Sequence, residues 1–124
     1  MNNDALQVIN TLFNLPAKGD EQDWDIELAD KDRVEEFINA MHTNDFNSSE
    51  KYAVMGLILG SYDDYLRWEI DKDNRIWLNI INILEENREI YSNILNYWAL
   101  WHHKQQEYLF NITFLVREYR KNPI

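Results

Sequence analysis

The histidines and acids near the end of the chain are the first candidates for chemistry. His103 and Glu107 are four residues apart, so on a helix they share one face, as metal ligands often do. A catalytic zinc ion needs three protein ligands, but the adjacent His102 points about 100° away on a helix. His42 is the only other imidazole in the sequence. We therefore expect partly exposed histidines at a helix end, where they suit the helix dipole, and no metal.

The other motifs for catalysis or cofactor binding are incomplete. Asp71 and Asp73 begin like a calcium loop, but Ile76 and Asn82 stand where an EF-hand needs Gly and Glu. There is no Gly-x-Ser-x-Gly nucleophile motif and no glycine-rich phosphate loop, and the chain has three glycines and no cysteine. Paired acids on predicted helices are typical of solvated surfaces: Asp63 with Asp64, and Glu85 with Glu86. We expect neither an enzyme nor a cofactor.

Composition limits the remaining classes of protein. The 124 residues are one domain's worth, and 45% hydrophobic with 14% aromatic residues predicts a folded core. The net charge of -10 argues against binding of nucleic acid through its phosphates. The longest uncharged stretch, residues 90–103, is too short to span a membrane, and the first residues lack the pattern of a signal peptide. We therefore expect a cytoplasmic protein.

The negative charge is concentrated in the first 50 residues, which hold 12 acids against three bases. Nine of these acids fall between Asp20 and Glu36, around Trp24. A second acidic and aromatic segment follows at residues 62–68. Tyr and Trp dominate binding hot spots, and carboxylates attract basic partners. We expect a partner-binding surface from both segments: Asp20, Glu21, Asp23, Trp24, Asp25, Glu27, Asp30, Tyr62, Asp63, Asp64, Tyr65 and Trp68. The competing interpretation is that the aromatics fill the core and the acids provide solubility.

Hydrophobic periodicity predicts an all-α fold, a single domain of residues 1–124 in a compact bundle of about five to six helices. An extended acidic loop follows the first helix, and residues 24–28 alternate like a strand. The segment 108–117 fits a helix or a strand, with the helix favoured. The wide apolar arc of residues 75–87 predicts the central helix. The predicted helices cover residues 3–14, 30–42, 48–70, 75–87, 89–103 and 105–121, with Asn47 and Asp73 as caps.

Gly56 and Gly60 share one face of the predicted helix at residues 48–70. Glycines four residues apart let another backbone approach closely. We expect a close helix crossing within the chain, with a dimer contact as the alternative. No homo-oligomer is predicted.

A small, cysteine-free, acidic, helical chain rich in Trp and Tyr resembles the bacterial immunity proteins that neutralise a cognate toxin. These include the immunity proteins of contact-dependent growth inhibition and of the nuclease colicins. The likeness is one of character over the whole chain, and rests on Asp20-Glu21-Gln22-Asp23-Trp24-Asp25 and Tyr62-Asp63-Asp64-Tyr65.

The resemblance implies stoichiometric, tight binding of a toxin, a nuclease whose surface is basic because it holds phosphates. The acids around Trp24 would supply charge, and Trp24, Tyr62, Tyr65 and Trp68 would be the anchors. Two alternatives stay open. One is a helical regulatory or adaptor protein that binds another basic protein, such as a DNA-binding protein. The other is a small helical metal-binding enzyme that uses His42, His102 and His103.

Overall fold

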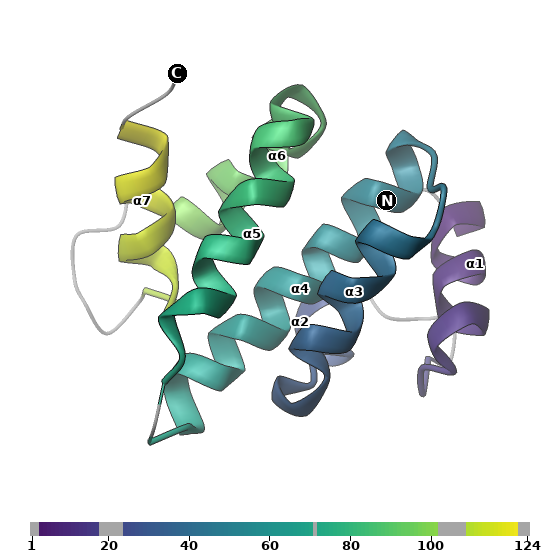
Figure 1. The fold of residues 1–124 in the computed structure, drawn as a ribbon, viewed down its shortest axis with the longest axis horizontal. Coiled ribbons are helices and arrows are strands. Elements are labelled where there is room, and N and C mark those ends of the chain that lie inside the picture. Colours follow the sequence, from purple (N-terminus) through teal and green to yellow (C-terminus); the bar gives the residue numbers. More distant parts are fainter. Residues whose placement is uncertain (1–2, 18–23, 71, 102–108, 122–124) are drawn as a thin grey trace.

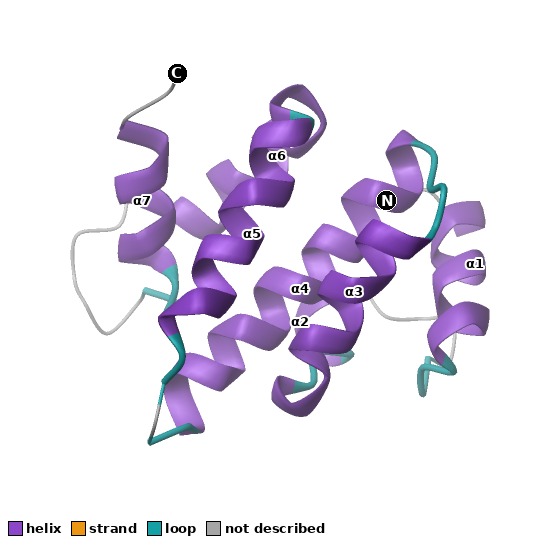
Figure 2. Cartoon of the chain, viewed as in Figure 1, coloured by secondary structure: helices purple, strands orange, loops and turns teal. Residues whose placement is uncertain are grey.

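The computed structural model describes residues 3–17, 24–70, 72–101 and 109–121. In these ranges the chain forms seven α-helices and one 3-10 helix and no strand, which confirms the predicted all-α fold (Figure 1, Figure 2). The elements are α1 (Asn3–Phe13), α2 (Trp24–Glu27), η1 (Lys31–Arg33), α3 (Val34–Thr43), α4 (Ser48–Trp68), α5 (Asn74–Glu86), α6 (Arg88–Ala99) and α7 (Thr113–Lys121).

Helix α4 is the centre of the fold. All residues from 53 to 62 are buried, and α1, α2, η1, α3 and α6 pack on it. Small side chains on α4 make room for these neighbours: Ala53, Gly56, Gly60 and Ser61. The prediction that residues 75–87 form the central helix is wrong. Helix α5 packs on α3 and α6 and leaves Leu78 57% exposed, so its wide apolar arc is only partly covered.

The helix starts follow the predicted caps. The Asn47 side chain accepts from the backbone N–H of Glu50 at 2.8 Å, and the Glu50 carboxylate accepts from Asn47 N at 2.9 Å, which completes a capping box. Asp30 accepts from the N–H of Asp32 at 3.0 Å at the start of η1. Asp73 accepts from the N–H of Arg75 at 2.9 Å at the start of α5. These interactions are local, so the sequence alone identifies them.

Helices α1 and α6 both end earlier than expected, each at a residue in the left-handed region. Helix α1 ends at Phe13, before Pro16, because Asn14 has φ 52° and the N–H of Leu15 bonds to Asn10 O at 3.0 Å. Helix α6 ends at Ala99, not near residue 103, and Leu100 has φ 47°. The Arg117 guanidinium donates to the carbonyl oxygen of Ala99 at 2.6 Å and to that of Leu100 at 2.5 Å.

The expected extended segment at residues 24–28 is instead one helical turn, α2. The N–H of Leu28 donates to Trp24 O at 2.9 Å, and both side chains are buried while Ile26 is exposed. Residues four apart, such as Trp24 and Leu28, lie on the same face in a strand and in a helix. The pattern of residues 24–28 therefore looked like that of a strand. Helix α2 lies on the glycines of α4. A Cβ on Gly60 would overlap the carbonyl oxygen of Asp25, and one on Gly56 would lie 2.9 Å from the Trp24 ring. The glycines therefore mark the expected close crossing.

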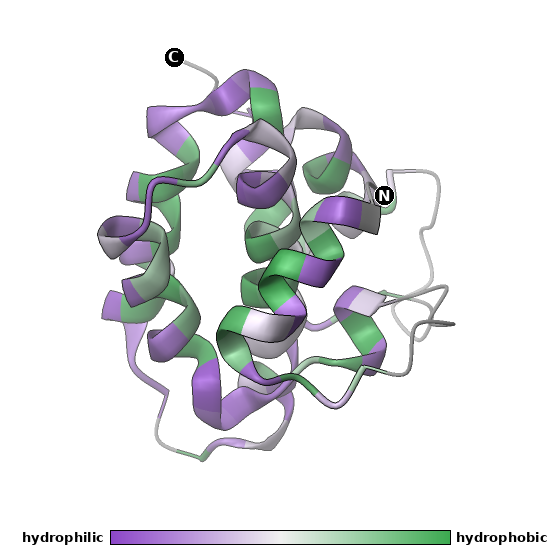
Figure 3. Ribbon diagram, turned by 90° about the vertical axis from the view of Figure 1, so that its right-hand side faces the viewer, coloured by the Kyte–Doolittle hydropathy of each residue, from purple (hydrophilic) through white to green (hydrophobic). Residues whose placement is uncertain are grey.

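Helix α7 shows that the strand alternative for residues 108–117 is wrong within its described part. A strand would put Phe110, Ile112 and Phe114 on one face, but Ile112 is buried and Phe114 is exposed. Ile112 and Val116, four residues apart, are both buried, as a helical turn requires. Each α-helix contributes buried hydrophobic residues to one core, and green hydrophobic segments alternate with purple hydrophilic ones along the helices in Figure 3. Among the described helices, none has the length and apolar character to cross a membrane.

Candidate functional site

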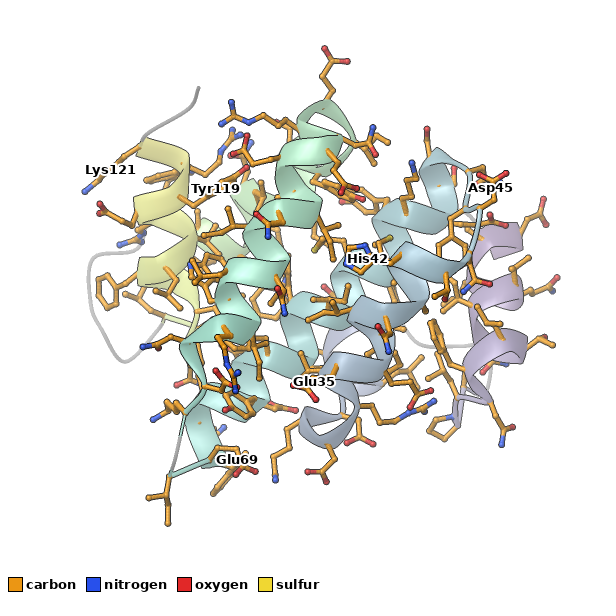
Figure 4. The ribbon with its side chains drawn as sticks, in the orientation of Figure 1. Glu35, His42, Asp45, Glu69, Tyr119 and Lys121 are labelled. Carbon is orange, nitrogen blue, oxygen red and sulfur yellow. The ribbon has the colours of Figure 1, made fainter. Side chains whose placement is uncertain are left out.

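A groove of about 250 Å³ opens where η1, the start of α3, the end of α4 and the start of α5 meet. Glu35 on α3 and Glu69 after α4 mark it on the face seen in Figure 4. We call it the acidic groove. Its lining residues are Lys31, Asp32, Val34, Glu35, Tyr65, Glu69, Asp73 and Ile76.

Four carboxylates and one ammonium group line the acidic groove. Lys31 Nζ lies 2.5 Å from Glu69 Oε1 and 3.2 Å from Asp32 Oδ1. Lys31 donates both hydrogen bonds, and they raise its pKa, with the larger effect from the bond to Glu69. Asp73 pairs with Arg75 at 2.9 Å, and the hydrogen bonds from Arg75 lower the pKa of Asp73. Glu35 makes no side-chain hydrogen bond or ion pair with the described residues. The acidic groove therefore presents excess negative charge.

Tyr65 forms a wall of the acidic groove and is held from behind by other aromatic rings. Its hydroxyl oxygen accepts from the backbone N–H of Asp73 at 2.6 Å. The Tyr65 ring stacks on Tyr62 at 5.6 Å between centroids, and Tyr62 stacks on Trp77 at 5.8 Å. Burial raises the pKa of Tyr62 to about 12. This column of rings fixes the wall, which suits a preformed binding surface.

Exposed apolar side chains lie next to Glu69 in the sequence. Trp68 at the end of α4 is 62% exposed, and Ile70 is 93% exposed. The Arg67 guanidinium lies 4.8 Å from the Trp68 ring centroid. A large exposed indole beside a groove with an excess of carboxylates is typical of a protein-binding surface, because Trp provides rigid contact area and the acids provide specificity.

The expected partner-binding residues differ in their burial. Three of them are buried, which corrects their expected role as surface contacts: Trp24, Asp25 and Tyr62. Trp24 packs on Gly56 under α2, and Tyr62 lies between Tyr65 and Trp77. The burial of Trp24 and Asp25 follows from the crossing of α2 over α4, which sequence periodicity does not reveal. For Trp24 and Tyr62, the interpretation that aromatic residues fill the core describes the structure.

Two acids on α4 are half-buried. The Asp63 carboxylate accepts from the N–H of Ile112 at 3.0 Å and so holds the start of α7. Burial raises the pKa of Asp63 and that of Asp64, so both sites favour the protonated form more than a solvated carboxylate does. Glu27 and Asp30 are exposed, with Asp30 capping η1. Asp20, Glu21 and Asp23 lie outside the described residues.

Sequence reasoning identified Tyr65 in the acidic groove and Trp68 beside it, but missed the other lining residues. Asp32 and Glu35 were counted only in the acidic segment, and Asp73 only as a cap. Lys31 and Glu69, 38 residues apart, become partners because η1 packs on α4. The one sequence signal that points to these residues is the density of acids at residues 30–36 and 69–73.

No group of three or more His, Asp or Glu side chains among the described residues is arranged to hold a metal ion. His42 is exposed on α3, whereas His102, His103 and Glu107 lie outside the described residues. The chain matches no protein-family model, and no curated protein or solved structure shows significant similarity to it.

Proposed function

We propose that this chain is an immunity protein, a cytoplasmic inhibitor that binds one cognate basic toxin, a nuclease, through the acidic groove. The observation that carries the proposal is the lining of the groove: four carboxylates against one ammonium group, with Trp68 exposed beside Glu69. A nuclease surface that holds phosphates presents Lys and Arg, which are complementary to this lining.

The groove has acceptors suited to a guanidinium or ammonium group of the toxin. Charge-assisted hydrogen bonds to carboxylates are stronger than neutral ones, and Arg can bind both oxygens of one carboxylate. Lys31 is paired with Glu69 in the free protein, but a partly exposed ion pair contributes little to stability, so an incoming Arg can replace Lys31. Trp68 would then cover apolar surface of the toxin and anchor the complex.

Bound in this way, the protein would inhibit the nuclease by occupying its phosphate-binding residues or by lying beside them. In the second case the net charge of -10 repels the nucleic acid. Either route requires only binding, with no reaction at the groove. The charge also accelerates association, which suits a protein that must reach a toxin before the toxin reaches nucleic acid.

The test uses the purified chain and the nuclease domain that the proposal expects to be encoded beside its gene. The association rate constant is measured by stopped-flow fluorescence over a range of salt concentrations. The triple variant Glu35→Gln, Glu69→Gln, Asp73→Asn should associate roughly tenfold more slowly at low salt and show a flatter salt dependence. Asn at position 73 still caps α5, so the fold is kept.

The matched control removes the same charge from three exposed acids elsewhere: Asp45→Asn, Glu86→Gln and Glu89→Gln. This control should associate nearly as fast as the unmodified chain. Equal slowing by both triples would show that net charge acts without the groove. Absence of binding between the unmodified chain and the neighbouring nuclease domain would contradict the proposal itself.

A further inference from the structure

A second hollow, of about 290 Å³, lies on the other side of α5, between α5 and α7. Helix α5 lies between α3 and α7 in Figure 1, and Tyr119 of α7 lies on the side away from Glu35 in Figure 4. We call it the α5–α7 hollow. Its lining residues are Trp77, Ile81, Glu85, Leu115, Glu118 and Tyr119.

The α5–α7 hollow is the centre of a larger apolar surface. Leu78 is 57% exposed and lies three residues before Ile81, on the same face of α5. Phe114 is 55% exposed and lies four residues before Glu118 on α7. Exposed apolar surface with a polar rim is typical of a protein interface.

The α5–α7 hollow and the acidic groove lie on either side of α5. Ile76 lines the groove and the next residue, Trp77, lines the hollow. The stack of Tyr65, Tyr62 and Trp77 joins the two walls inside the protein. A ligand that fills one site is therefore close to the other.

Charge decides which kind of ligand fits both sites. Glu118 and Glu85 stand at the rim of the hollow, where Glu85 accepts from the Tyr119 hydroxyl at 2.8 Å and lies 3.7 Å from Arg88. The neighbouring groove carries four carboxylates and one ammonium group. An apolar ligand with Lys and Arg residues on one flank is complementary to this combined surface.

We infer that the α5–α7 hollow takes an apolar side chain from an amphipathic helix of the same basic partner, while Lys or Arg residues of that helix enter the acidic groove. The inference rests on the proposed function and adds that the segment of the partner bound here is an amphipathic helix. The residues of this part of the chain that line the two sites run from Asp73 to Glu85 and span about 18 Å, so a partner helix of about 12 residues covers both.

The probes are three synthetic helical peptides of equal length, added to the isotope-labelled full chain in NMR titrations. One combines leucine with lysine, one serine with lysine, and one leucine with glutamate. The leucine–lysine peptide should shift both the groove amides of Glu35 and Glu69 and the hollow signals of Trp77, Ile81 and Leu115. The serine–lysine peptide should shift only the groove, and the leucine–glutamate peptide neither site.

A variant gives a second readout. Ile81→Ala with Leu115→Ala should weaken the leucine–lysine peptide about tenfold, to the affinity of the serine–lysine peptide. The control Leu12→Ala, at an exposed position of α1, should bind as the unmodified chain does. Circular dichroism checks that each variant is folded, and the titrations of the unmodified chain do not depend on the variants.

The outcomes separate the two proposals. Groove shifts without hollow shifts, or equal hollow shifts with the serine peptide, would overturn the inference alone. A groove that responds to neither lysine peptide would overturn both proposals. Hollow signals that change with protein concentration, together with a dimer in sedimentation, would assign the hollow to a second copy of this chain and also overturn the inference.

Discussion

The Asp63 carboxylate on α4 accepts the backbone N–H of Ile112 at 3.0 Å, 49 residues further along the chain. Asn111 adds a side-chain hydrogen bond to the Asp63 carbonyl oxygen at 3.3 Å, and the Thr113 hydroxyl donates to Trp98 O at 2.9 Å. These bonds fix the start of α7 against α4 and α6. An acid that the sequence assigns to partner binding therefore acts in the fold.

Burial of Asp63 predicts a pH-dependent stability. Its pKa is raised mainly by desolvation, against the opposing hydrogen bonds of Ile112 and Asn111. The folded state therefore binds the proton more tightly than the unfolded state, and this stabilising effect is lost as pH rises from about 3.9 through the folded pKa. Asp63→Asn, which keeps the acceptor, should be at least as stable as the unmodified chain at pH 7. Its advantage should vanish in acid, as measured by urea unfolding.

Truncation of Asp63 to alanine should lower the stability of the fold instead of keeping it. Asp63→Ala leaves the N–H of Ile112 without its acceptor and should lower the free energy of unfolding by about 1–3 kcal/mol at pH 7. Equal stability of the Ala and Asn variants would show that the hydrogen bond to Ile112 contributes nothing.

The crossing of α2 over α4 predicts unequal effects of two similar substitutions. Gly60→Ala places a methyl group on the carbonyl oxygen of Asp25, a backbone atom, and should destabilise the fold by about 1–3 kcal/mol. Gly56→Ala meets the side chains of Trp24 and Ile94, which can adjust, and should cost less. Thermal unfolding followed by circular dichroism measures both. A more stable Gly60→Ala variant, as ordinary helix propensity predicts, would disprove the close approach.

Trp24 and Trp68 were both predicted from the sequence to bind the partner, but their substitution should affect stability differently. Trp24 is 5% exposed, so Trp24→Ala should cost about 3–5 kcal/mol of stability. Trp68 is on the surface, so Trp68→Ala should change stability by less than about 0.5 kcal/mol. The same Trp68 variant should weaken toxin binding by about 2 kcal/mol, as measured by calorimetry. Unchanged affinity would exclude Trp68 from the interface.

The left-handed residue after α1 gives a test of the helix end. Asn14 is exposed with φ 52°, so Asn14→Ala should destabilise by about 1–2 kcal/mol, whereas Asn14→Gly should not. Asn79→Ala, at an exposed position inside α5, is the control and should not destabilise the protein. Urea unfolding compares the three variants, and a neutral Asn14→Ala would contradict the assigned conformation.

The sequence predicts what depends on neighbours in the chain. The caps at Asn47 and Asp73 need only the next three residues, so they were predicted correctly. The burial of Trp24 depends on Gly56 and the crossing of α2 over α4, 32 residues away, so periodicity could not assign it. Residues 75–87 were wrongly predicted as the central helix for the same reason, because the packing of the other helices on α4 depends on contacts between distant parts of the chain.

The acidic groove was only partly predicted for a related reason. Its charge was visible as a surplus of acids, but its shape comes from residues 31 to 76 in four separate elements. Lys31 meets Glu69 only through packing, and a sequence pattern cannot show which acids of a charged segment gather and which disperse.

The buried stretch of α4, residues 53–62, contains none of the residues that line the acidic groove. Under the proposed function, natural selection can therefore change the charges of the groove while the centre of the bundle is inherited unchanged. A lineage of such chains could diverge quickly in binding preference and still retain one architecture.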